Sequence, residues 1–247
     1  MGTGVRRMAA IGLSFSLPYT SQMPKSFPEA SDPLFIRILE LCEAEVPGFR
    51  VAFKDCSKFM KFLNVFAQVF NKTFMTGYIT VMGGCVYFPN KKELIDCQAD
   101  YANVLAHELV HMKEQQKTGK LVHFFRYGSP QIFAVLSLLS VLAFINPWFL
   151  LCLTFLLCLA PIPAVGRKNI EMNGYEMSLA MTYWRTGQIG EADIEWAAQQ
   201  FTSSNYYFMY PFEEAVLHEL RLRAIHVRTG QVLSKHIFQK VYACVKP

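Results

Sequence analysis

Residues 107–111 read His-Glu-Leu-Val-His, within a stretch that the sequence predicts to be one long helix. No Gly or Pro occurs between residues 99 and 118, so nothing in this stretch favours a break. Residues four apart lie one turn apart on the same face of a helix, so His107 and His111 can bind a single metal ion. Glu108 points to a neighbouring face, where it can accept a proton from a water without being a ligand itself.

Zinc is the metal that this H-E-x-x-H pattern favours. Imidazole nitrogens are common zinc ligands, and a catalytic zinc site combines three protein ligands with one position left for water. The two central residues, Leu109 and Val110, are apolar, as a half-buried helix requires. The pattern therefore predicts Zn²⁺ bound by His107 and His111, with Glu108 as the catalytic base, which is typical of a zinc-dependent peptidase.

The third protein ligand is not fixed by the motif. His123 is close in sequence, but we interpret it as a surface histidine of an amphipathic helix. The other candidates are Glu171 and Glu176, which lie on a helix predicted later in the chain. Five residues apart, they point about 140° apart on a helix, so only one of them can face the metal well.

An uninterrupted apolar segment, 131–165, separates the motif from these glutamates and contains no Asp, Glu, Lys, Arg or His. A single helix of that length would reach about 52 Å, well beyond a hydrocarbon core of about 30 Å. Asn146-Pro147 interrupts the segment and predicts two helices, 132–145 and 148–160, folded as a hairpin. Each would reach only about 21 Å, so we expect the hairpin to dip into a bilayer rather than cross it cleanly. The alternative is a hairpin buried in a soluble core.

Basic residues flank the apolar segment on both sides, which predicts that both of its ends lie on the cytoplasmic side of a membrane. The chain carries a net charge of +5, but its Lys and Arg do not form the blocks typical of nucleic-acid binding. We therefore expect a lipid bilayer and a protein or peptide substrate, especially a membrane-bound one, as partners, and no nucleic acid. The flanking basic residues are Lys113, Lys117, Lys120 and Arg126 before the segment, and Arg167 and Lys168 after it.

The overall pattern predicts an α+β fold: one mostly helical domain, 1–247, with a small sheet before the motif helix and the hairpin 131–165 inserted into it. The strand Val86-Tyr87-Phe88 or its hairpin partner, 78–81, is expected to be an edge strand that binds a substrate backbone. The N-terminal segment 8–17 is expected to be a loose terminus or a weak membrane-surface segment. The remaining expected elements are a strand at 50–53 and helices at 33–45, 57–70, 98–117, 168–186, 191–202, 211–229 and 231–244.

The order of these features resembles that of the membrane-embedded gluzincins, which include the bacterial heat-shock membrane protease and the CAAX-processing protease. In that layout an H-E-x-x-H helix and an apolar hairpin are followed by a helix that reads approximately E-x-x-A-D and supplies a Glu ligand. Residues 171–175 read Glu-Met-Asn-Gly-Tyr here, so Glu171 takes the ligand place and Gly174 the small-residue place. Tyr175 replaces the Asp of the family, which affects how the ligands are supported.

The chain is also similar to small H-E-x-x-H proteins of bacteria and phages, which carry a strand end like Tyr87-Phe88-Pro89 before the motif. Together the resemblances cover about residues 78–180. They imply a zincin-like fold, with Zn²⁺ held by His107, His111 and Glu171.

The implied activity is that of a membrane-associated zinc endopeptidase, which hydrolyses peptide bonds by a metal-activated water with Glu108 as general base. An oxyanion-stabilising group is also needed, and Tyr175 and His123 are candidates, although a structural role is preferred for each. The alternative is a membrane-anchored structural or binding protein, such as a virion component, that retains a metal site without turnover.

Overall fold

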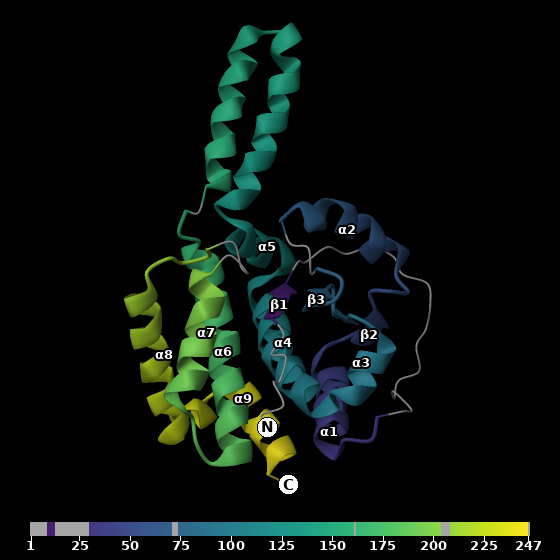
Figure 1. The fold of residues 1–247 in the computed structure, drawn as a ribbon, viewed down its shortest axis with the longest axis vertical. Coiled ribbons are helices and arrows are strands. Elements are labelled where there is room, and N and C mark those ends of the chain that lie inside the picture. Colours follow the sequence, from purple (N-terminus) through teal and green to yellow (C-terminus); the bar gives the residue numbers. More distant parts are fainter. Residues whose placement is uncertain (1–8, 13–29, 71–73, 161, 204–207, 247) are drawn as a thin grey trace, which may run out of the picture.

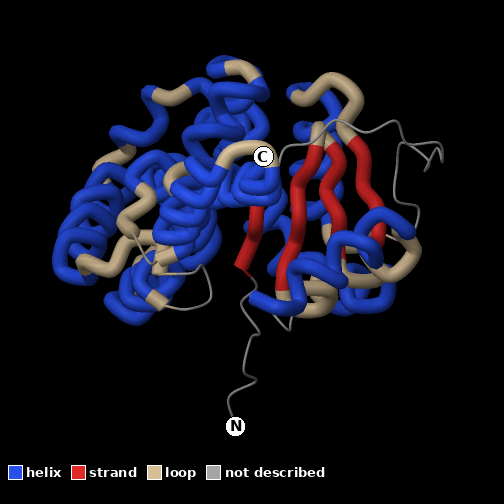
Figure 2. Tube along the Cα trace, turned by 90° about the horizontal axis from the view of Figure 1, so that it is seen from above, coloured by secondary structure: helices blue, strands red, loops and turns tan. Residues whose placement is uncertain are grey.

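The computed structural model describes residues 9–12, 30–70, 74–160, 162–203 and 208–246. It is a mostly helical α+β structure with one small sheet, as the sequence predicts (Figure 1). The strands gather at one side of the molecule and the larger group of helices at the other (Figure 2). That the chain forms a single domain, 1–247, stays a prediction.

The elements follow the predicted order closely. Ser57 caps α2 as expected, because its Oγ accepts a hydrogen bond from the Met60 backbone N–H at 3.2 Å. Three elements were not predicted: strand β1, helix α3 and a separate helix α5 before the hairpin. In chain order, the elements are β1 (Ala9–Gly12), α1 (Pro33–Glu45), β2 (Arg50–Phe53), α2 (Lys58–Phe70), β3 (Tyr78–Met82), β4 (Cys85–Phe88), α3 (Lys91–Asp96), α4 (Gln98–Thr118), α5 (Lys120–Gly128), η1 (Gln131–Phe144), η2 (Pro147–Leu159), α6 (Val165–Thr186), α7 (Glu191–Thr202), α8 (Glu213–Arg228), η4 (Gln231–Ser234) and α9 (His236–Val245).

The sheet has four strands in the order β1-β3-β4-β2. β3 and β4 form the predicted antiparallel hairpin, while β1 pairs with β3 and β2 pairs with β4 in parallel. The expectation that Val86-Tyr87-Phe88 or its partner 78–81 is an edge strand is therefore wrong, because both strands are interior. The outer side of β3 is taken by β1, so residues 9–12 are not the loose terminus that was expected. The rest of the segment 8–17 lies outside the described residues.

The motif helix α4 lies at the centre of the molecule, between the sheet and α6 (Figure 1). Side chains alternate along a strand, so Val86 and Phe88 of β4 face the main core beside α4, while Cys85 and Tyr87 face a second core under α2. The Phe88 ring contacts Tyr101 of α4 edge-to-face, with centroids 4.9 Å apart. The sheet thus fixes one side of α4 and leaves its other side for α6.

The apolar segment forms a hairpin, as predicted, and it projects from the body at the end opposite α9 (Figure 1). Its two limbs are 3₁₀ helices rather than α-helices, and Asn146 caps the second limb by accepting a hydrogen bond from the Trp148 N–H. A 3₁₀ helix rises about 2.0 Å per residue, so the limbs reach about 28 and 26 Å, further than predicted. Most of its large apolar side chains are exposed, so this hairpin is not buried in a core of the chain itself.

Among the described residues, no single helix has both the length and the apolar character to cross a membrane. One bent pair, Lys120–Gly128 with Gln131–Phe144, meets the criteria of length and composition together, with a bend of 88°.

A sharp turn at Gly119 separates α4 from α5. Gly119 has a φ of 86°, in a region that L-residues with a side chain rarely adopt, so glycine ends the motif helix cleanly here. After this turn α5 begins, and it carries His123 and Tyr127 at buried positions.

Candidate metal centre

Three side chains that could bind a metal meet between α4 and α6. His107 and His111 come from α4 and Glu171 comes from α6, and one ligand atom of each lies within 4.8 Å of the others. The two Nε2 atoms are 2.9 Å apart, and each lies 3.5 Å from Oε2 of Glu171. All three side chains are buried. This group can hold a metal ion, and it is the set of ligands that the sequence and the resemblance implied.

Gly174 allows α6 to come close enough for this group to form. A Cβ atom at this position would lie 2.5 Å from Nε2 of His107 and 2.8 Å from Nε2 of His111. Real Cβ atoms do not approach other atoms so closely, so any larger residue would push the imidazoles or the helix aside. The small-residue place of the resembled pattern is thus explained by packing against both imidazoles.

Two further side chains orient the ligands. Tyr127 of α5 donates a 2.7 Å hydrogen bond to Oε1 of Glu171, which leaves the buried Oε2 facing the imidazoles. Ser178 lies 3.1 Å from Nδ1 of His107, so Nε2 is the nitrogen that faces the group.

Neither of these two orienting residues was predicted from the sequence. Residues 171, 174 and 178 follow the spacing of one helix face, a signal that could have identified Ser178. Tyr127 has no such signal, because only the turn before α5 brings it to Glu171.

Glu108 lies next to this group but is not part of it. Its side chain is fully buried, and neither carboxylate oxygen has a hydrogen-bond partner among the described residues. Burial raises the pKa of Glu108 to about 8. A buried carboxyl group without a partner beside two histidines is consistent with the predicted role of a base that needs a water to act on.

The charges of the site favour a cation. Burial alone would raise the pKa of Glu171, but the adjacent imidazoles of His111 and His107 hold it far below its usual range. For a histidine, burial has the opposite effect, and it lowers the pKa of His107. Burial would also lower the pKa of His111, but the Glu171 carboxylate outweighs it and raises this pKa to about 9. An anionic Glu171 therefore stabilises positive charge at the imidazoles, which is the charge that a divalent metal ion supplies.

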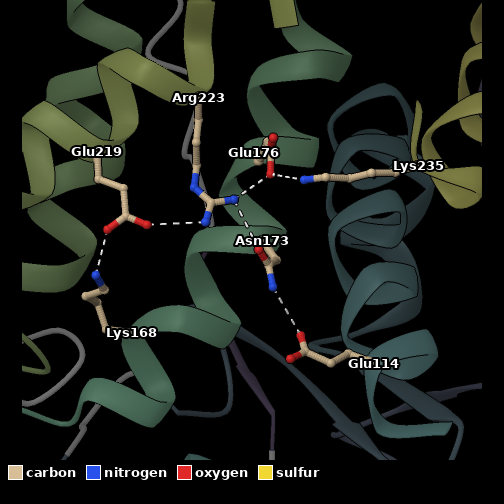
Figure 3. Close-up of polar contacts among 7 residues, drawn as sticks. All are labelled: Glu114, Lys168, Asn173, Glu176, Glu219, Arg223 and Lys235. Carbon is tan, nitrogen blue, oxygen red and sulfur yellow. Dashed lines mark hydrogen bonds and ion pairs between the residues drawn. The ribbon is translucent and has the colours of Figure 1, made fainter. Parts of the chain in front are cut away.

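Glu176, the other candidate ligand, is turned away from the histidines. It is buried and forms ion pairs with Arg223, at 2.5 Å, and with Lys235, at 2.7 Å. Arg223 also donates to Asn173, and Asn173 in turn donates to Glu114 of α4, at 3.4 Å (Figure 3). This network fixes the rotation of α6, so that Glu171 and not Glu176 faces α4.

His123 and Tyr175 are both buried, so the interpretation of His123 as a surface histidine is wrong. The His123 ring stacks on Tyr127 at 6.4 Å, and its Nδ1 has no hydrogen-bond partner among the described residues. The Tyr175 ring contacts His107 edge-to-face, with centroids 5.0 Å apart, and packs against Trp196 and Phe201. Where the resembled family has Asp, this chain therefore supports His107 by aromatic packing.

Comparison with protein-family models, curated proteins and solved structures finds no match to this chain.

Proposed function

We propose that this protein is a zinc-dependent endopeptidase with a zincin-like arrangement. The ligands would be His107, His111 and Glu171, and Glu108 would be the general base. The observation that carries the proposal is that one ligand atom from each of these three residues lies within 4.8 Å of the others, beside the buried carboxyl group of Glu108 on α4. Two imidazoles and one carboxylate are a donor set that suits zinc and leaves one position open.

The residues of the chain divide the work of hydrolysis. A zinc ion bound here would supply a Lewis acid that makes water more acidic. Glu108 accepts a proton from the water, whose oxygen adds to the peptide carbonyl carbon. Glu108 then passes that proton to the amide nitrogen as the C–N bond breaks, so that the atoms balance. Ser178 and Tyr127 keep His107 and Glu171 in orientation throughout.

We also propose that the hairpin lies in a membrane and that the metal centre is on the cytoplasmic side. Each limb reaches about 26 to 28 Å, close to the roughly 30 Å of a hydrocarbon core. Trp148 lies beside the hairpin tip and is 74% exposed, as suits an aromatic residue at the far membrane interface. The basic residues on both flanks of the hairpin support the same orientation.

The test is a comparison of Glu108→Gln with the parent protein, using full-length chain in detergent micelles and a fluorescently quenched casein as the probe. We expect the variant to keep one zinc per chain and to lose casein hydrolysis, because it retains the ligands and removes the base. The matched control is Glu195→Gln, a change at an exposed position on α7, which should keep both properties. Parental turnover in Glu108→Gln would exclude Glu108 as the base.

The burial of the whole site favours a second candidate function. His107, His111, Glu108 and Glu171 are all almost completely buried, so a substrate needs a rearrangement to reach them. The second candidate is a membrane-anchored binding or structural protein that holds a metal without turnover. Bound zinc without hydrolysis of casein by the parent protein would favour this candidate over the peptidase.

A further inference from the structure

Helix α5 has two faces with different surroundings. On its inner face, His123 and Tyr127 are buried, and Tyr127 bonds the metal-site carboxylate. On its outer face, Leu121 is 74% exposed and Phe125 is 52% exposed, with Val122 exposed between them. Leu121 and Phe125 are one turn apart, so they form one apolar stripe. The helix therefore buries two polar aromatic side chains and leaves an apolar stripe exposed.

The orientation of α5 fits a membrane surface. α5 lies at the foot of the hairpin (Figure 1), and its axis is at 88° to the first hairpin limb. When the hairpin stands along the bilayer normal, α5 consequently lies in the plane of the membrane. That is the orientation of interfacial helices, which bury an apolar face at the boundary between headgroups and acyl chains.

Other exposed apolar side chains gather at the same end of the molecule. Phe62 and Val65 of α2 are exposed, and Figure 1 shows α2 at the level of α5. Phe208 and Phe212 are also exposed, and their segment is tied to the end of the hairpin by the hydrogen bond from Ala164 N to Met209 O, at 2.8 Å. These exposed side chains lie on segments at the same end of the molecule as α5 and the hairpin.

The charges near α5 complete the pattern of a lipid-binding helix. Lys117, Lys120 and Arg126 are all exposed at or beside α5. Lys and Arg beside an apolar face that enters a leaflet attract its anionic headgroups. The combination of apolar stripe, orientation and basic residues favours an anionic bilayer surface over a protein partner as the occupant.

We propose that α5 is an interfacial helix whose outer face, Leu121, Val122 and Phe125, is embedded in the leaflet that the hairpin enters. The proposal rests on the insertion of the hairpin proposed above. Tyr127 lies on the opposite face of α5 and donates to Glu171 of α6, so the candidate metal group lies about one helix diameter, roughly 10 Å, below that surface.

The test uses the full-length protein in vesicles of equal phosphatidylserine and phosphatidylcholine, with a benzophenone amino acid replacing one residue at a time. Phe125 is the test position. Trp148, in the hairpin, is the positive control, and Ile225, exposed on α8, is the matched negative control. After illumination, mass spectrometry detects lipid adducts. We expect adducts at positions 125 and 148 and several-fold fewer at 225. Adducts at 125 should favour phosphatidylserine, and Lys117→Gln/Lys120→Gln should remove that preference.

Each other outcome overturns a distinct part of the proposal. Lipid adducts at 148 without adducts at 125 would refute the interfacial helix and leave the hairpin proposal intact. Lipid adducts at neither position would refute the membrane location as well. A crosslinked pair of chains at 125 would show that a second copy covers α5. Equal yields at 125 and 225 would show that contact with lipid is not specific to α5, and an unchanged lipid preference in the double variant would remove the role of the lysines.

Discussion

Glu171 and Glu176 offer a sharp test of the metal centre, because both are buried on the same helix but have different partners. We expect Glu171→Gln to keep its fold and to lose zinc. Changes that only disturb the support of a metal ligand cost about 10- to 100-fold in affinity, so removal of a ligand should exceed about 100-fold. We expect Glu176→Gln to keep zinc and to lose stability instead.

The size of the stability loss follows from the ion pairs of Glu176. Breaking a buried pair costs about 3–5 kcal/mol, because the remaining charge is left without compensation. After the change, Lys235 can be solvated, because it is 47% exposed, and Arg223 still pairs with Glu219 at 3.2 Å. We therefore expect the loss in the free energy of unfolding to lie at the lower limit of this range, about 3 kcal/mol.

Two measurements on metal-loaded and metal-free protein separate these effects. Zinc content is measured after competition with a chelator, and the free energy of unfolding is measured with denaturant after the metal is removed. We expect opposite results for the two variants. Loss of zinc in Glu176→Gln together with retention in Glu171→Gln would refute the assignment of the third ligand.

Two further changes test the packing of the site and of the second core. Gly174→Ala should lower zinc affinity by about 10-fold or more, because its Cβ would clash with both imidazoles. The stability of the metal-free protein should change by no more than about 2 kcal/mol, because the better helix propensity of Ala offsets part of the clash. The control is Gly190→Ala, where a Cβ would meet nothing closer than 3.5 Å, and equal zinc affinity in both variants would contradict the packing argument. Burial lowers the pKa of Lys54 to about 7. Between pH 7 and 10 this lysine therefore holds its proton in the unfolded chain but has lost it in the folded chain. The free energy of unfolding should consequently rise by about 1.4 kcal/mol per pH unit over this range. Lys54→Met should remove this slope in denaturant titrations at pH 7 and pH 9, and an unchanged slope would show that Lys54 is not its source.

The sequence could predict those features that depend on local pattern. Helix α1, strand β2 and the β3–β4 hairpin were all expected, because hydrophobic periodicity and turn residues define them. Strand β1 was missed because Ala9–Gly12 has little strand character and becomes a strand only by pairing with β3. The 3₁₀ geometry of the hairpin was missed because an apolar composition does not distinguish it from an α-helix.

The candidate site also has parts that the sequence could predict and parts that it could not. The spacing of His107 and His111 places them together in any helix, so their pairing could be predicted without the fold. The choice between Glu171 and Glu176 could be made only by resemblance, because the rotation of α6 depends on Arg223 and on other residues far away in the sequence. Tyr127 could not be identified at all, since its contact with Glu171 depends on the turn at Gly119 and on how α5 packs.

The hairpin and the metal centre constrain each other through that last contact. Tyr127 lies just before the apolar segment and Glu171 just after it, and their side chains are joined by a 2.7 Å hydrogen bond. A segment that crossed a bilayer once would separate its two ends by about 30 Å of hydrocarbon, and this hydrogen bond could not form. If the hairpin enters a bilayer, as we propose, its two ends must therefore lie on the same side of that bilayer for the candidate site to form. Any movement of the hairpin base would act directly on α5, on Tyr127 and thus on the carboxylate that completes the metal site.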